Sequence, residues 1–85
     1  MKKDISAEQI RAARGLIDWT REDLAKASGV TVRTLARVES SQTVPREATL
    51  AALSSALEAA GVEFIPENGG GRGVRLALGF QPKRP

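Results

Sequence analysis

Two arginines four residues apart, Arg33 and Arg37, are the side chains of this sequence best suited to polar recognition. Residues at this spacing share one face of a helix, so both guanidinium groups would project from the same side. A guanidinium group donates paired hydrogen bonds to guanine and to phosphate, the acceptors that duplex DNA presents. Val32, just before them, offers methyl groups that suit the 5-methyl group of thymine. Residue type and spacing alone leave two interpretations open, a nucleic-acid contact and a face that is charged only for solubility.

Several residue types on which enzymes and metal sites depend are missing from the chain. Its 85 residues include no His, no Cys and no Tyr. Their absence removes thiol nucleophiles, zinc fingers and the usual general base near neutral pH. Because no cluster of titratable side chains has catalytic spacing either, we predict that the protein is not an enzyme and needs no metal ion or other cofactor. A formal net charge of +3 is only a modest indication of a polyanionic binding partner.

No segment has the character of a membrane span or an export signal. The longest apolar runs are far shorter than the roughly 18 residues that a bilayer requires. The polar start, Met1-Lys2-Lys3-Asp4, has no apolar signal core. We therefore expect an intracellular protein with no membrane partner.

Helix start and stop signals predict four short helices before residue 61. Ser6 and Gln9 have the spacing of a capping box, which begins a helix at residue 7 that runs to residue 16 or 17. Thr20 is the next candidate N-cap. The helix that follows it stops at Gly29, because glycine can take the left-handed conformation of a helix end.

Thr31 caps a third expected helix, residues 32–39, only two residues later. Pro45 is expected to begin a fourth helix that closes at Gly61, because its torsion angle suits a helix start and its missing N–H would be unpaired there anyway. Apolar residues at helical spacing, together with Trp19 between helices, predict the core side chains: Ile10, Ala13, Leu16, Ile17, Trp19, Leu24, Leu35, Val38, Leu50, Leu53 and Leu57. The segments predict a compact, mainly α-helical bundle.

Two short helices joined by a tight turn that contains glycine form a helix-turn-helix arrangement. The stretch from Thr20 to Glu39 resembles the phage-repressor/Cro-type (XRE) helix-turn-helix family. The resemblance rests on an alanine in the first helix, a turn motif, and an aliphatic, a basic and an acidic residue in the second helix: Ala25, Gly29-Val30-Thr31, Leu35, Arg37 and Glu39. It extends over roughly residues 10–61.

The resemblance implies a lambda-repressor-like four-helix bundle in a sequence-specific transcriptional regulator that binds double-stranded DNA. Residues 32–39 would be the recognition helix in the major groove. The residues expected to face base edges are Val32, Arg33 and Arg37. The residues expected to hold backbone phosphates are Thr20, Arg21, Thr34, Ser40, Ser41, Gln42 and Arg46. Such a regulator would be cytoplasmic, of bacterial or phage type, and associated with the nucleoid when bound to DNA.

Two positions depart from the family pattern. Arg21 stands where the family usually has a glutamine whose side-chain amide holds a phosphate, and arginine can serve the same phosphate. Ser40-Ser41 stand where the family usually has Asn-Gly, and their hydroxyl groups can also reach a phosphate. The departures therefore affect the expected geometry of the phosphate contacts.

The C-terminal part predicts a β-hairpin, with strands at residues 62–65 and 74–78 around a glycine-rich loop. A hairpin alone is marginally stable in water, so it must pack on the helices or pair with another chain. A similar tail follows the helical domain in some small bacterial regulators of this family. We expect a symmetric homodimer through the hairpin, with packing on its own bundle as the alternative. The expected interface residues are Val62, Phe64, Ile65, Val74, Leu76 and Leu78.

The sequence thus divides into a DNA-binding domain (1–61), a hairpin extension for dimerisation (62–80) and a tail (81–85). Two recognition helices in a dimer would suit a palindromic operator. With no sensor domain, control would come from concentration, competing sites or a regulatory protein partner. The alternatives are an antitoxin-type regulator that binds DNA and a toxin protein, and a protein-interaction adaptor that does not bind DNA.

Overall fold

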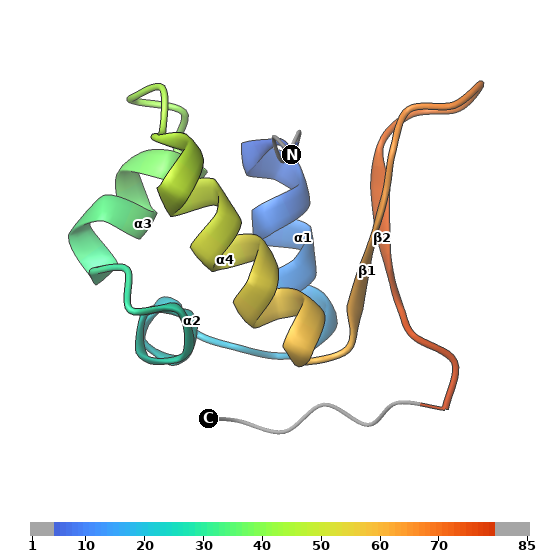
Figure 1. The fold of residues 1–85 in the computed structure, drawn as a ribbon, viewed down its shortest axis with the longest axis horizontal. Helices are drawn as coiled ribbons and strands as arrows, with labels where there is room; N and C mark the ends of the chain where they lie inside the picture. The colour runs from blue at the N-terminus through green and yellow to red at the C-terminus, as the bar shows by residue number, and fades with distance from the viewer. Residues whose placement is uncertain (1–4, 80–85) are drawn as a thin grey trace.

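The computed structural model of the chain describes residues 5–79, and this range forms four helices followed by a two-stranded antiparallel sheet (Figure 1). The elements are α1 (Ala7–Leu16), α2 (Arg21–Ser28), α3 (Val32–Glu39), α4 (Glu47–Ala59), β1 (Val62–Ile65) and β2 (Gly73–Leu76). The predicted mainly helical bundle with a C-terminal hairpin is confirmed. The predicted tail, residues 81–85, lies outside the described range.

The first three helices begin and end where the capping signals place them. The Ser6 side chain accepts a hydrogen bond from the Gln9 backbone N–H at 3.1 Å, while Gln9 Oε1 accepts one from the Ser6 N–H at 2.9 Å. Thr20 and Asp23 form the same reciprocal box at the start of α2. Gly29 ends α2 in the left-handed conformation, with φ 77°. These local bonds satisfy backbone groups that a helix terminus would otherwise leave unpaired.

Three details of the predicted elements are wrong. The fourth helix begins at Glu47 and not at Pro45, because Arg46 has an extended backbone (φ −67°, ψ 149°) and is the N-cap. The fixed φ of proline is compatible with an extended segment as well as with a helix, so Pro45 does not by itself begin one. Leu16 is 40% exposed, since α1 ends there and Ile17 turns into the core in its place. The second strand ends at Leu76, so that Leu78 lies in the following turn, fully exposed.

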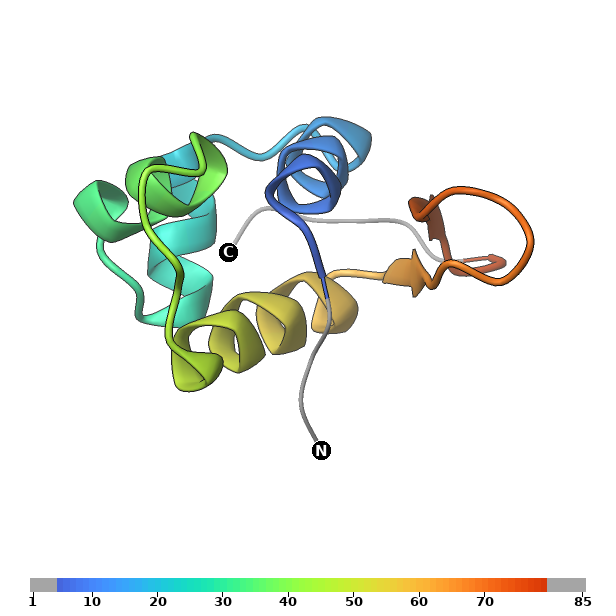
Figure 2. The same cartoon turned by 90° about the horizontal axis from the view of Figure 1, so that it is seen from above.

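One apolar core joins all four helices to the hairpin. Its buried members come from every helix and from β1: Ile10, Ala13, Ile17, Trp19, Leu24, Leu35, Val38, Leu53, Leu57, Ala60 and Val62. Figure 1 shows α3 at one end of the molecule and the hairpin at the other, with α1 and α4 between them. Figure 2 shows the hairpin standing beside α1 and α4. The sheet therefore covers the helices on the side away from α3.

The hairpin packs through one face onto its own helices. Its register pairs Val62 with Leu76 and Phe64 with Val74, so these four side chains lie on the same face of the sheet. Val62 is in the core, and the other three pack against it. The opposite face carries the exposed pair of Glu63 and Arg75, whose Oε1 and Nε atoms are 2.7 Å apart. In the single chain the hairpin is thus completed by its own bundle.

Candidate nucleic-acid interface

Helix α3 is fixed to the core by one face and leaves the other face open. Leu35 is fully buried and Val38 nearly so, one turn apart along the helix. Arg33 and Arg37 are both exposed, and Val32 is 37% exposed at the first position of α3. The three residues expected to face base edges therefore share the accessible side of the recognition helix. A helix presented in this way can enter a major groove with its N-terminal end and its outer face.

Part of the expected phosphate-binding set gathers around a groove beside α3. The groove encloses about 480 Å³, and its walls come from α3, from the loop after it and from the start of α4: Thr34, Arg37, Thr43, Val44, Arg46 and Thr49. It brings one expected base contact, Arg37, next to two expected phosphate contacts, Thr34 and Arg46. Two guanidinium groups and three hydroxyl groups give this groove the chemistry of an anion-binding surface.

The hydroxyl groups of Thr31 and Thr34, at the start of α3, are joined by a hydrogen bond. Thr31 Oγ1 accepts from the Thr34 backbone N–H at 3.2 Å and donates to Thr34 Oγ1 at 3.0 Å. The Thr34 hydroxyl accepts this bond, so its own proton remains available to a phosphate oxygen. Thr20 lies at the start of α2, where its side chain caps the helix.

The loop after α3 is shaped by a helix-ending motif. The Gln42 N–H donates to the Arg37 carbonyl at 3.0 Å and the Ser41 N–H to the Val38 carbonyl at 3.1 Å, the two bonds of a Schellman motif. Ser41 takes the left-handed conformation, with φ 59°, at the position where the family usually has glycine. Ser40 Oγ donates to the Arg37 carbonyl at 3.2 Å, so a bond from this hydroxyl to a phosphate would require it to turn.

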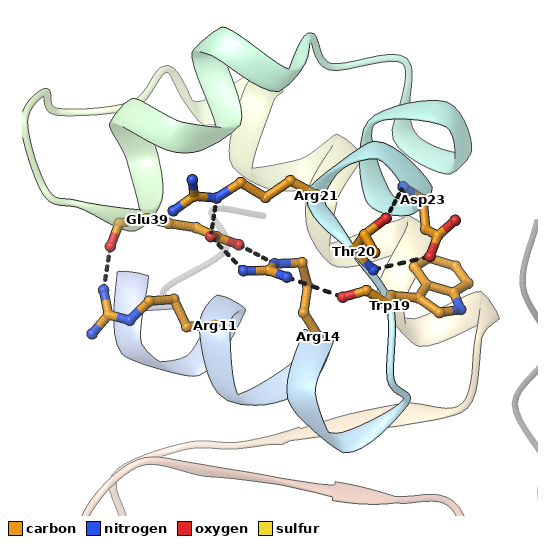
Figure 3. Close-up of polar contacts among 7 residues, drawn as sticks. All are labelled: Arg11, Arg14, Trp19, Thr20, Arg21, Asp23 and Glu39. Carbon is orange, nitrogen blue, oxygen red and sulfur yellow. Dashed lines mark hydrogen bonds and ion pairs between the residues drawn. The ribbon is translucent and has the colours of Figure 1, made fainter.

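A buried acid ties the interface to the rest of the bundle. The Glu39 side chain is 0% exposed, and its Oε2 and Oε1 accept from Arg14 Nε at 2.6 Å and from Arg14 Nη2 at 2.9 Å (Figure 3). Arg21 Nε donates to the same Oε1 at 2.9 Å. Arg14 and Arg21 come from α1 and α2, so the carboxylate joins three helices at the end of α3.

The charge state of Glu39 follows from these contacts. Burial of the carboxyl group would by itself raise its pKa, but hydrogen bonds from Arg14 and Arg21 and the charges of the two arginines hold the pKa below its ordinary value of 4.5. Sequence reasoning used Glu39 only as a motif residue and placed Arg21 only at a phosphate. It missed Arg14 altogether, because Arg14 lies 25 positions before Glu39 and no local pattern pairs the two residues.

The residues expected at a dimer interface do not all have the same access to a partner. Val62 is only 2% exposed and belongs to the core, while Phe64, Val74 and Leu76 are partly buried against it. Ile65 lies on the outer face, and Leu78 is fully exposed after β2. The side chains of four of these six residues therefore serve the chain's own packing.

The sequence match agrees with this geometry. Residues 10–64, more than half of the chain, match the helix-turn-helix family of the XRE (Cro/C1-like) type, and the chain belongs to this family. The predicted resemblance is thus confirmed, and the protein is a DNA-binding regulator of the XRE type. No match is found among curated proteins.

Over residues 5–79, no helix is long and apolar enough to cross a membrane. The same residues contain no group of His, Cys, Asp or Glu side chains that could hold a metal ion. The family is one of DNA-binding regulatory domains and not of enzymes.

Proposed function

We propose that this protein is a sequence-specific regulator that binds a palindromic operator as a homodimer, with α3 in the major groove. The observation that carries the proposal is the open face of α3, where Arg33 and Arg37 are exposed while Leu35 holds the helix to the core. Each arginine can make a bidentate contact to guanine, and a good pair discriminates against a wrong base by about 1–3 kcal/mol. The expected phosphate contacts around this face would set the register on the duplex.

Selection of bound duplexes from random DNA, followed by titration of the selected site, tests the DNA-binding part. The selected site should bind far more tightly than random duplex, and both affinities should fall steeply as salt rises, because counterions are released. Arg37→Ala should weaken binding to the selected site by about 1–3 kcal/mol, so that its affinity for this site comes closer to its affinity for random duplex. Absence of DNA binding even at low salt would favour the protein-interaction adaptor.

The homodimer would use the free edge of β2. The Ala77 N–H donates to the Gly61 carbonyl at 2.7 Å, so residues 61, 63 and 65 exchange hydrogen bonds with residues 77, 75 and 73. The N–H and C=O groups of Val74 and Leu76 then point away from β1. They have no hydrogen-bond partner among residues 5–79. An unpaired edge of this kind is a template for a strand of a second copy.

The β1 edge is a poorer candidate than the β2 edge. Its outward-pointing groups belong to Val62 and Phe64, and Val62 is almost entirely buried as a whole residue. Pairing of β2 with β2 of a second copy would keep both apolar inner faces on their own helices. Because α3 lies at the end of the molecule opposite the hairpin (Figure 1), the two recognition helices would then lie well apart, as two half-sites require.

A proline in β2 tests this interface. Val74→Pro removes an outward-facing N–H without touching the β1–β2 hydrogen bonds, whereas Val74→Ala loses similar packing but keeps the N–H. Sedimentation equilibrium should show a dimer for the wild type and Val74→Ala, and a monomer for Val74→Pro. A Val74→Pro variant that remains dimeric would place the interface elsewhere.

A further inference from the structure

Three guanidinium groups meet Glu39 where α1, α2 and α3 join. Arg14 and Arg21 bind the Glu39 carboxylate, and Arg11 Nη1 donates to the Glu39 backbone carbonyl (Figure 3). Within residues 5–79, Glu39 is the one carboxylate that forms ion pairs with these arginines. Glu8 and Glu22 are close in sequence, but neither forms an ion pair with these arginines within residues 5–79. The junction therefore carries a surplus of positive charge.

The three arginines differ in how much of their hydrogen-bonding capacity is used. The Arg14 side chain is 19% exposed, and its Nε and Nη2 donate hydrogen bonds to the Glu39 carboxylate. Its Nη1 donates to the Trp19 carbonyl at 3.0 Å, so the role of Arg14 is structural. Arg21 is 42% exposed and engages only Nε. Arg11 is exposed and engages only Nη1. The remaining donors of Arg11 and Arg21 have no acceptor in the described part of the chain.

We propose that Arg11 and Arg21 together hold one backbone phosphate of bound DNA, and that Glu39 positions both arginines for it. Figure 3 shows the two guanidinium groups flanking Glu39, that of Arg21 beside its carboxylate and that of Arg11 beside its backbone carbonyl. The carboxylate fixes Arg21 through Nε, which leaves both of its terminal nitrogens to donate. The Glu39 backbone carbonyl holds Arg11 by accepting a hydrogen bond from its Nη1. Arg11 thereby joins the DNA-contacting surface, to which the sequence had not assigned it.

A phosphate suits this place for reasons of charge and position. A guanidinium group binds phosphate oxygens through paired hydrogen bonds, and the negative charge of one phosphate would offset part of the surplus positive charge of the junction. Arg21 stands at the first position of α2, and Ser40 follows Glu39 directly in the chain. Both are expected phosphate contacts, so the pair of arginines extends a surface already directed at the DNA backbone. The inference rests on the proposed DNA binding and adds a contact to it.

The test is the salt dependence of DNA affinity for Arg11→Gln, Arg21→Gln and the double variant, on the selected site and on random duplex. Each single variant should lose about tenfold in affinity on both DNAs, because a phosphate contact carries no sequence information. The slope of log K against log salt should stay close to the wild-type value in each single variant, because the remaining arginine still neutralises the shared phosphate. In the double variant the slope should become shallower by about 0.9 per protomer.

Matched variants separate this contact from a folding effect. Lys26→Gln, which removes an exposed cation from a later turn of α2, should leave the slope unchanged. Arg11→Lys should keep the wild-type slope, because the charge remains, while binding more weakly. A wild-type affinity in Arg11→Gln, or a wild-type slope in the double variant, would overturn the inference even if Arg37→Ala loses specificity. Failure of the wild type to bind DNA would instead reject the proposed function.

Discussion

Replacing Glu39 by glutamine is the most informative single change in the bundle. The carboxylate is 0% exposed and accepts three charge-assisted hydrogen bonds, two from Arg14 and one from Arg21. Removing one partner of a buried ion pair costs about 3–5 kcal/mol, because the remaining charges are left uncompensated. Glutamine keeps one acceptor oxygen but places its NH₂ group against a guanidinium group. We therefore expect Glu39→Gln to lower the free energy of unfolding by about 3 kcal/mol.

The pH dependence of the same variant gives a second, independent readout. The pKa of Glu39 is lower in the folded chain than its ordinary value of 4.5. Its stabilising contribution is therefore complete above this ordinary value and is lost as the pH falls through the lower folded pKa. Glu39→Gln has no such group to protonate. The difference in unfolding free energy between wild type and variant should be largest near pH 7 and should shrink in strong acid.

Urea unfolding followed by far-UV circular dichroism measures both quantities. For a domain of this size, a loss of about 3 kcal/mol corresponds to a fall in melting temperature of roughly 12–24 °C. Glu67→Gln, which changes an exposed glutamate in the hairpin loop, should shift stability by less than about 0.5 kcal/mol. A loss below about 1 kcal/mol in Glu39→Gln, or one that does not vary with pH, would refute the role assigned to this carboxylate.

Three further substitutions test local features by the same urea assay. Ser41→Gly should stabilise the chain by about 1 kcal/mol, because Ser41 holds a left-handed φ of 59° that glycine adopts without strain, and an unchanged midpoint would argue against that conformation. Ser54→Ala should stabilise by up to about 1 kcal/mol, because the buried Ser54 Oγ has no hydrogen-bond partner within residues 5–79; a loss of stability would mean that the hydroxyl is satisfied. Gln9→Glu keeps the capping box but sets a carboxylate against the Ile65 and Gly73 carbonyls that Gln9 Nε2 now binds at 3.3 Å and 3.0 Å, so it should cost about 1–3 kcal/mol. Ser6→Ala, which removes only the cap, should cost about 1 kcal/mol, and equal losses in the two variants would show that the link to the hairpin contributes little.

The helices could be predicted from the sequence because their ends are set by local bonds. Ser6, Thr20 and Thr31 each bind a backbone N–H three residues ahead, and Gly29 takes a conformation that few other residues tolerate. Such signals act over a single turn and can be read without knowing the fold. The start of α4 carries no side-chain cap, and there the sequence prediction was two residues early.

The polar network at Glu39 could not be predicted, because it joins residues that are distant in sequence. Arg14 and Glu39 are 25 positions apart, and nothing in their local patterns pairs them. The same holds for Gln9, whose capping role was evident but whose second contact reaches 64 positions along the chain to Gly73. Tertiary packing decides which of several arginines meets the buried acid.

The orientation of the hairpin is a further case of this kind. The sequence pattern in residues 62–65 and 74–78 indicates two strands. It does not say whether these strands meet the chain's own helices or another copy. The structure turns Val62, Phe64, Val74 and Leu76 towards α1 and α4. A dimer through the hairpin would therefore rely mainly on backbone groups of the edge, and less on the apolar side chains expected from the pattern.

The central claim is that Arg37 on α3 reads a base pair. Its most direct test is to change each base pair of the selected site in turn and to measure the loss of affinity for the wild type and for Arg37→Ala. Changing the base pair at one position in each half-site should reduce the binding free energy of the wild type by about 1–3 kcal/mol and that of the variant by almost nothing. The same pattern of losses in both proteins would show that Arg37 reads no base.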